Sequence, residues 1–305
     1  MTRPLRLGTR RSALALAQSR QVAASVAAAL GRRVDLVEIT TRGDTDQAPL
    51  ASIGGTGVFV SALRAALMEA AVDLAVHSMK DLPTAPAPQL VVAAVPPRAD
   101  ARDALVSPTA PGELACGARI GTGSPRRAAV LRSWGLTPVP LRGNVDSRVA
   151  RVRSGELDGV VLAVAGLTRL AIDDLPVHPL DPAEMIPAPG QGALAVETRA
   201  GTALADDLAA IDDVSSHAAV RAERAALAAL EAGCSAPVGV LGTVTSTTLR
   251  LHGRVWSHDG LDPADADVTG DVSDAVELGR DLASTLLRRG AADLIPPPRT
   301  KETAL

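Results

Sequence analysis

The sequence predicts an α/β protein in which two similar domains enclose a hinged cleft and a small α+β domain follows. Strand-like apolar runs alternate with helix-like segments twice, with a break at Pro96-Pro97. Such alternation favours right-handed crossovers and a parallel sheet. The stretch 185–197 is rich in Gly and Pro and is typical of a hinge. From about residue 215 the alternation stops, which indicates a third domain of another build.

The first α/β domain is expected to begin with a short strand at Leu5–Gly8. Ser12 has the residue type of an N-cap for a helix that extends to about Leu30. The next elements are expected to be a strand at 34–40, a Gly-rich loop at 41–57, a helix with Val60, Leu63 and Leu67 on one face, and a strand that ends at His77. His77 itself is expected to be a packed core histidine.

The second α/β domain repeats this order. Ser124 and Pro125 predict a helix start, because serine caps the helix and proline suits its first position. The other elements are expected to be strands at 118–121, 139–141 and 159–165 and a helix at about 146–154. After the hinge, a strand is expected to return to the first sheet. The domain limits predicted in this way are 1–96 with a return segment at about 193–211, then 100–186, then 215–305.

Composition narrows the class of protein. The 305 residues are 47% hydrophobic and carry a net charge of −3, so no bulk charge favours binding to nucleic acid or a membrane. Aromatic residues make up 1%, too few for base-stacking platforms. No apolar run is long enough for a membrane helix, and no signal-peptide pattern is seen at the start, so we expect a cytoplasmic protein. The two cysteines, Cys116 and Cys234, and the scattered histidines show no metal-ligand spacing.

Polar residues follow nearly every predicted strand of the two α/β domains. Ligands of open α/β sheets bind beyond the carboxyl ends of the strands, where these residues would meet. Most of the clusters contain arginine, whose planar fork suits carboxylate or phosphate. They are Thr9 to Ser12, Thr41 to Asp44, Ser78 to Asp81, Thr122 to Arg127, Arg142 to Arg148 and Gly166 to Arg169. A single arginine is usually a solvated surface charge, but so many corresponding clusters predict a cleft for a polyanionic ligand.

Lys80 stands out among these residues. The chain has 31 basic residues, and the only other lysine is Lys301 near the C-terminal end. A lysine beside Asp81 at a strand end is a candidate for chemistry, although drift in an arginine-rich composition would also explain it. Cys234 follows a helix end at Gly233. It is either a buried structural cysteine or a covalent attachment point on a loop.

Several motifs together closely resemble the porphobilinogen deaminase (hydroxymethylbilane synthase) family. The resemblance covers nearly the whole chain, and its specificity lies in the order and spacing of the motifs. They are Leu7-Gly-Thr-Arg-Arg-Ser-Ala-Leu-Ala-Leu-Ala-Gln18, Thr41-Arg-Gly-Asp44, Val76-His-Ser-Met-Lys-Asp-Leu-Pro83, Gly121-Thr-Gly-Ser-Pro-Arg-Arg127, Leu141-Arg-Gly-Asn-Val-Asp-Ser-Arg148, Leu162-Ala-Val-Ala-Gly-Leu-Thr-Arg169, Pro189-Gly-Gln-Gly-Ala193, Ala222-Glu-Arg224 and Gly233-Cys234.

The resemblance implies two periplasmic-binding-protein-like α/β domains, a small C-terminal domain and a monomer. It implies that four porphobilinogen molecules are joined head to tail with loss of ammonia, on a dipyrromethane cofactor bound by a thioether to Cys234. It assigns proton handling to Asp81, with Lys80 beside it. It implies cofactor contacts at Lys80, Asp81, Ser78, Thr122, Ser124, Arg126, Arg127, Arg142 and Gly166, and substrate contacts at Arg10, Ser12, Gln18, Phe59, Arg142, Arg148 and Arg169.

The chain departs from the family pattern in two places. Ser52 and Thr56 stand where family members often have lysine, which leaves open how the 41–57 loop contacts substrate. Gly123 and Pro125 replace commoner residues and should stiffen the helix start. Two other classes remain open from the residues alone. One is a two-domain solute-binding protein for a polycarboxylate, which would need an export signal, and the other is the sensor half of a transcription regulator, which would need a helix-turn-helix segment.

Overall fold

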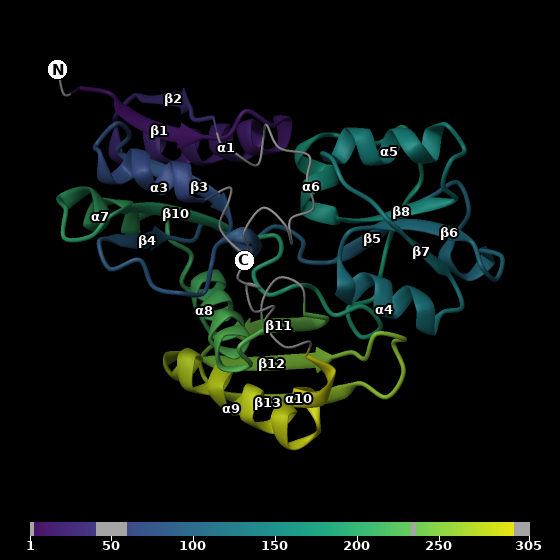
Figure 1. Ribbon diagram of the computed structural model, residues 1–305. Coiled ribbons are helices and arrows are strands. Elements are labelled where there is room, and N and C mark those ends of the chain that lie inside the picture. The colour runs from purple at the N-terminus through teal and green to yellow at the C-terminus, as the bar shows by residue number, and fades with distance from the viewer. Residues whose placement is uncertain (1–2, 41–59, 233–235, 296–305) are drawn as a thin grey trace, which may run out of the picture.

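The computed structural model describes residues 3–40, 60–232 and 236–295. Two five-stranded sheets and one three-stranded sheet form three bodies, with the first α/β domain on the left of Figure 1, the second on the right and the third below. Strands of the third body lie under the junction of the other two. The expected class, two α/β domains and a small α+β domain, is confirmed.

The first sheet has the order β2-β1-β3-β10-β4. Its strands are β1 (Leu5–Thr9), β2 (Val34–Glu38), β3 (Leu74–Ser78), β4 (Leu90–Ala94) and β10 (Leu194–Arg199). The first three are parallel, but β10 runs antiparallel to both of its neighbours. The prediction of a parallel sheet therefore holds for β1, β2 and β3 but not for the two pairs that β10 makes, because β10 enters the sheet directly from the hinge and not through a crossover helix.

Helices cover both faces of this sheet. Ser12 accepts a hydrogen bond from the Ala15 backbone N and caps α1 (Ala13–Leu30), as predicted. Val22 and Val26 of α1 pack on Leu7 of the sheet, while the other face receives Leu63 and Leu67 of α3 (Ser61–Met68). A short α7 (Ala203–Asp207) and the 3₁₀ turn η3 (Leu208–Ile211) follow β10.

The second sheet has the order β7-β6-β8-β5-β9, which repeats the first. Its strands are β5 (Asp103–Val106), β6 (Arg119–Thr122), β7 (Thr137–Pro140), β8 (Gly159–Ala163) and β9 (Val177–Pro179). Again three strands are parallel, and β5 is antiparallel to both neighbours. Its helices are α4 (Pro125–Ser133), α5 (Val145–Arg153) and α6 (Val164–Arg169), and the 3₁₀ turn η2 (Pro111–Glu113) precedes β6.

Two sequence predictions in these domains need correction. The strand expected at 159–165 ends at Ala163, and Val164–Arg169 forms the short helix α6. The apolar run continues into that helix because its buried face packs on the same core, so periodicity over a few residues could not separate strand from helix. The strand expected at 34–40 ends at Glu38.

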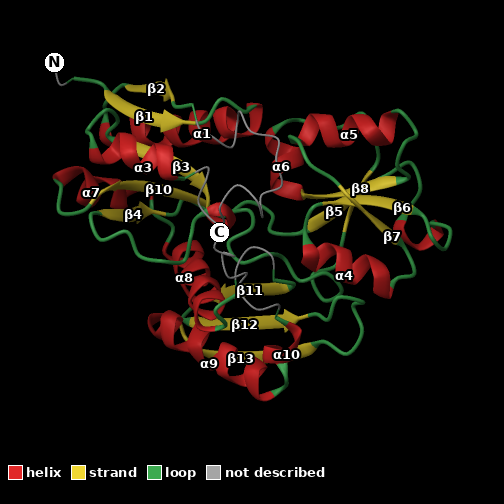
Figure 2. Cartoon of the chain, viewed as in Figure 1, coloured by secondary structure: helices red, strands yellow, loops and turns green. Residues whose placement is uncertain are grey.

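The third domain pairs an antiparallel sheet with two long helices (Figure 2). Its elements are α8 (Val214–Ala229), β11 (Val238–Thr245), β12 (Thr248–Val255), β13 (Ala264–Asp271), the 3₁₀ turn η4 (Val272–Asp274), α9 (Ala275–Arg288) and α10 (Ala291–Leu294). Leu251, Leu282 and Leu286 are among its fully buried core residues. Trp256 instead enters the core of the second domain beside Ile186, so the third domain is packed against the second.

Candidate active site

Lys80 and Asp81 lie on a 3₁₀ turn, η1 (Met79–Asp81), directly after β3. The hinge packs against this turn. The Met79 backbone N donates to the Ala193 carbonyl over 3.0 Å. Gly190 has a φ of +75°, and a Cβ added there would lie 2.7 Å from Met79 Cγ and 3.2 Å from the Lys80 backbone N. Glycine is therefore required, because its left-handed backbone and missing side chain let the hinge approach the turn.

Lys80 is half-buried, and its Nζ donates to Gln191 Oε1 over 3.4 Å. Burial, with the nearby charge of Arg127, lowers the pKa of Lys80 from 10.5 to about 8, although Asp81 and Asp103 act in the opposite direction. Charged residues of the second domain thus affect the pKa of Lys80 in the first domain. A carboxylate ligand at this point would favour the charged form of Lys80 further.

Gln191 and Asp103 form the centre of a buried network beneath Lys80. The fully buried Asp103 accepts from Arg126 Nη1 over 2.7 Å and from Arg127 Nη2 over 2.6 Å. Gln191 Nε2 donates to Asp103 Oδ1 and to the Ala101 carbonyl, each over 2.8 Å. These arginines hold the pKa of Asp103 well below its usual range, against the effect of burial.

Arg126 and Arg127 are predicted cofactor contacts, and the structure places them in the interior, 2% and 6% exposed. Arg127 donates with Nε and Nη2 to Asp103 and with Nη1 to the Val161 carbonyl. Arg126 Nη1 also donates to the Ile186 carbonyl over 2.7 Å. The charges of both arginines lower the pKa of Lys80. Hydrogen bonds of their guanidinium groups, however, go to Asp103 and to backbone carbonyls inside the protein.

Arg142 and Arg148 bring the second domain to Asp81. Arg148 donates from Nε to the Gly143 carbonyl over 2.8 Å. Burial lowers the pKa of Arg148, the charge of Arg127 lowers it further, Asp81 opposes this, and Arg142 again lowers it. Asp81, which is exposed, is therefore near cations of both domains. The excess of positive charge around one exposed carboxylate is the main electrostatic feature of the site.

The other predicted residues form smaller groups around this centre. Gln18 Nε2 donates to Ser78 Oγ over 2.9 Å, which joins α1 to the end of β3. Thr122 Oγ1 accepts from the Ser124 backbone N over 3.1 Å, and Ser124 caps α4 as predicted. The Ser12 and Ser124 hydroxyls accept hydrogen bonds from helix backbones, and such a hydroxyl can still donate its own proton.

Two further predicted residues lie where the first and second domains meet. Arg169 Nη2 donates to the Gly192 carbonyl over 3.0 Å, and its buried Nε has no partner among the described residues. Gly166 is buried, and a Cβ there would contact Leu14 of the first domain. Arg10 is half-buried on the loop between β1 and α1.

Some predictions fall outside the described residues. These are the ones on Cys234, on Phe59 and on the loop 41–57 with Ser52 and Thr56. The tail from 296 onward is also outside them.

The sequence analysis missed four residues of the site. Asp103 and Gln191 hold the buried arginines, and Glu223 and Arg98 hold the hinge. Glu223, fully buried on α8, accepts from Arg98 Nη1 over 2.6 Å and from the Gly190 backbone N over 2.6 Å. Three of the four could have been noticed in the sequence. Asp103 adjoins an apolar strand, Gln191 stands between two glycines, and Glu223 is part of the Ala222-Glu-Arg224 motif.

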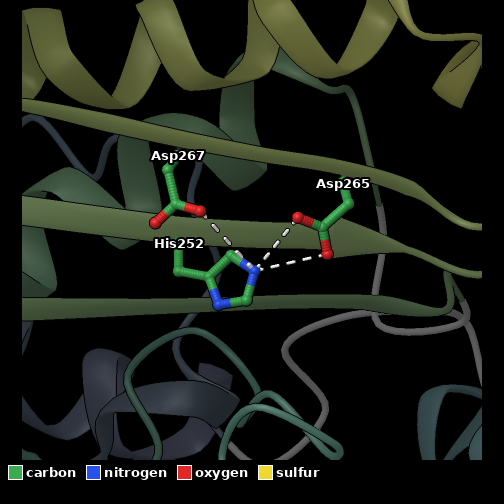
Figure 3. Close-up of side chains that lie close together, drawn as sticks. All are labelled: His252, Asp265 and Asp267. Carbon is green, nitrogen blue, oxygen red and sulfur yellow. Dashed lines mark hydrogen bonds and ion pairs between the residues drawn. The ribbon is translucent and has the colours of Figure 1, made fainter.

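A histidine and two aspartates gather on the sheet of the third domain (Figure 3). His252 Nε2 lies 3.2 Å from Asp265 Oδ1 and 4.0 Å from Asp267 Oδ2. Arg250 Nη2 lies 2.8 Å from Asp267 Oδ1, and Arg254 pairs with Asp265. Both carboxylates are thus already neutralised by arginine, so the group stabilises adjacent strands and is a poor cation site.

The described residues give no indication of a membrane span: none of their helices combines the necessary length with the necessary apolar character.

Comparison with known proteins agrees with this geometry. Residues 5–207 match the family model "Porphobilinogen deaminase, dipyromethane cofactor binding domain", and residues 217–288 match "Porphobilinogen deaminase, C-terminal domain". Porphobilinogen deaminase 1 of Streptomyces avermitilis is 53% identical, over 95% of this chain and 97% of the relative. Porphobilinogen deaminase of Nocardia farcinica is 51% identical, over 96% of this chain and 88% of the relative.

The solved structures that resemble the chain are more distant from it in sequence. The VFT2 domain of Bordetella pertussis BvgS has a TM-score of 0.41 at 14% identity, over 68% of this chain and 85% of that one. An arginine-specific periplasmic binding protein of Salmonella typhimurium has a TM-score of 0.40 at 13% identity, over 69% of this chain and 92% of that one. The sequence relatives and both family models extend through all three domains. The chain therefore belongs to the porphobilinogen deaminase family.

Proposed function

We propose that this protein joins four porphobilinogen molecules head to tail, with loss of one ammonia at each condensation, and releases hydroxymethylbilane by hydrolysis. It is a transferase of tetrapyrrole biosynthesis, the route to porphyrins and heme. The observation that carries the proposal is one exposed carboxylate, Asp81, set among cations of two hinged domains in a chain of this family.

The donor set fits a dipyrromethane cofactor, which carries acetate and propionate groups. Burial first, and then the charge of Arg127, lowers the pKa of both Lys80 and Arg148, so added carboxylates would stabilise the site. Arg169 has a buried Nε without a described partner, which also suits an anionic ligand. When bound through Cys234, the cofactor supplies the free α-carbon of its terminal ring as the carbon nucleophile.

We propose direct carboxylate contacts for Lys80, Arg142, Arg148 and Arg169, and hydroxyl or amide contacts for Ser12, Gln18, Ser78, Thr122 and Ser124. Arg10 and Phe59 are proposed substrate contacts, and Gly166 gives room for the cofactor. Arg126 and Arg127 are also proposed to contact the cofactor. Because both already bond to Asp103, part of their effect on the cofactor is proposed to come from their charge and not from direct hydrogen bonds.

Asp81 carries the proton chemistry in this proposal. In its protonated form Asp81 gives a proton to the departing amine, so that ammonia leaves. The carboxylate formed in this step stabilises the positive charge on the substrate carbon and then takes up the proton that the pyrrole loses when the new carbon–carbon bond forms. The charges of Lys80 and Arg148 act on the same point of the site. The hinge at Gly190 lets the two walls of the site separate as the chain grows.

The proposal extends to the organisation of the molecule. The domain limits are 1–96 with 193–211, 100–186 and 215–305, and the protein acts as a monomer in the cytoplasm without nucleic acid. The net charge of −3 supports the last point. A solute-binding or sensor protein for a polycarboxylate is not favoured, because the close relatives over the full chain are porphobilinogen deaminases.

Intact-mass analysis tests the proposal. The purified wild type should exceed its sequence mass by one dipyrromethane unit and should release hydroxymethylbilane from porphobilinogen. Cys234→Ser should have only its sequence mass, whereas the matched control Cys116→Ser should keep the adduct, since Cys116 is exposed at the surface of the second domain. A wild type without adduct and without product would reject the assignment.

A further inference from the structure

One arginine of the third domain donates hydrogen bonds to the backbone that follows Asp81. Arg224, on α8, donates from Nη1 to the Leu82 carbonyl over 2.7 Å and from Nη2 to the Pro83 carbonyl over 2.7 Å. The two bonds use both ends of the guanidinium fork on consecutive peptides. Such a pair fixes direction as well as distance, because the fork is planar and rigid. The backbone just after Asp81 therefore has its position set from another domain.

This arrangement is not the one that stability alone would favour. Burial lowers the pKa of Arg224, the charge of Arg64 adds to this, and Glu197 only opposes it. Glu197 already pairs with Arg64 over 2.8 Å and lies 3.2 Å from His77 Nε2. Arg224 thus directs a partly buried charge at neutral carbonyls, and burying a charge without a close counter-charge is unfavourable. A role in function would account for such a residue.

The helix that carries Arg224 also leads to the cofactor anchor. α8 ends at Ala229, and Cys234 follows five residues later. One turn before Arg224, Val220 packs in the same cluster as Met79 and Leu82 of the Asp81 turn. From Arg224 to Ala229 the helix rises by about 7–8 Å, at 1.5 Å per residue. α8 thus connects the turn that bears the acid to the segment that bears the attachment point.

We propose that Arg224 is a positioning residue that sets Asp81 relative to the cofactor attached at Cys234. This inference rests on the proposed function. In this role Arg224 acts through the backbone carbonyls of Leu82 and Pro83, so its loss should slow the proton-transfer steps and leave substrate affinity nearly intact. A displacement of about 1 Å in such a group is enough for a loss of about 10²-fold.

Arg224→Met tests the proposal against Arg221→Met, an exposed arginine on the same helix. Turnover is measured per molecule that carries the adduct by intact mass, which removes effects of folding or cofactor loading. We expect Arg224→Met to lower kcat by about 10–10²-fold with KM changed less than about 3-fold, and Arg221→Met to match the wild type. Equal kcat in the two variants would overturn the proposal.

A double-mutant cycle with Asp81→Asn separates positioning from a general structural role. If Arg224 acts through Asp81, Arg224→Met should have little further effect once that carboxylate is gone, as seen in single-turnover rates. Additive losses would reject the proposal. If Arg224→Met does not fold, Arg224→Lys serves instead: it keeps the charge but cannot bond both carbonyls in the same geometry, so its kcat should fall and its KM should not. A wild type that carries no adduct and forms no product would contradict the proposed function. A wild type that carries the adduct and is active supports that function, and the Arg224 variants are then compared with it.

Discussion

Asp103 and Arg127 form a buried ion pair, with Arg127 Nη2 2.6 Å from Asp103 Oδ1. Arg126 takes the other carboxylate oxygen, and Gln191 also donates to Oδ1. One carboxylate therefore neutralises two interior cations below the active site.

Asp103→Asn should lower the free energy of unfolding by about 3–5 kcal/mol, because it leaves buried guanidinium groups without their counter-charge. The measurement is urea unfolding at neutral pH. Asp100→Asn is the matched control, since Asp100 pairs with Arg102 at the surface and should contribute less than about 1 kcal/mol. Similar losses for both variants would contradict the structural role given to Asp103.

The same residue predicts how stability changes with acid. The arginines lower the pKa of Asp103 in the folded state, so its contribution is fully present above the unfolded-state pKa, near 3.8. It is lost as the pH falls further, because the unfolded state then binds more protons. Unfolding measured below about pH 4 should thus show a steeper loss of stability for the wild type than for Asp103→Asn.

Lys80 predicts an alkaline limb in the activity. Its pKa of about 8 means that the free enzyme loses this charge as the pH rises through that value. The kcat/KM for porphobilinogen should fall above about pH 8, since the carboxylate contact weakens. Lys80→Arg keeps its charge, so its profile should lack this limb even though a fork fits the site less well. A shared limb in both profiles would assign it to another group.

The ionisation of Lys80 affects stability in the direction opposite to its effect on activity as the pH rises. The folded state has the lower pKa, so between about 8 and 10.5 the unfolded state binds more protons. The contribution of this group to the free energy of unfolding therefore rises with pH across that window. Lys80→Met should remove this rise in unfolding curves of the cofactor-free protein.

Gly190→Ala should reduce activity as well as stability. The new Cβ would collide with Met79 and press on the Lys80 backbone, and the positive φ adds strain of about 1–2 kcal/mol. Gly201→Ala is the control, because Gly201 has a φ of +68° with nothing within 4 Å of an added Cβ. Thermal unfolding should show a larger shift for Gly190→Ala, and only that variant should lose turnover.

Asp81→Asn should lower turnover by about 10²–10⁴-fold, the usual range for a lost proton-transfer group. Asparagine keeps the shape of the side chain but cannot shuttle a proton. Steady-state assays with porphobilinogen check this, with the remote, exposed Asp281→Asn as control. Near-normal turnover in Asp81→Asn would remove this residue from the mechanism.

Local signals explain what the sequence could predict. Ser12 and the Ser124-Pro125 pair mark helix starts because capping is a property of a few adjacent residues, and both caps are present. The α/β pattern also predicts that the arginines after the strands lie at the carboxyl ends of the sheets. These signals need no knowledge of which distant segments meet.

Pairing between distant segments was the part that could not be predicted. Asp103 meets Gln191 across 88 positions of chain, and neither residue by itself indicates the other. The same holds for Arg224 and the carbonyls after Asp81. β5 was missed because only three apolar residues follow Asp103 in it, a run too short to indicate a strand. The buried Asp103 at its start is tolerated only because two arginines from α4 reach it. The bonds that Arg126 and Arg127 make to Asp103 could not be predicted from the sequence for the same reason.

The placement of β10 has a consequence for the order in which the protein forms during translation. β4 pairs with β10 alone, and β10 also completes β3. The first sheet therefore cannot close until 194–199 have left the ribosome, whereas every strand of the second sheet lies between Asp103 and Pro179 and emerges earlier. Nascent chains usually fold from the N-terminal domain onward. Here the sheet of the middle domain is the first whose strands can all pair, although Trp256 joins its core only later, and the N-terminal sheet must wait for β10.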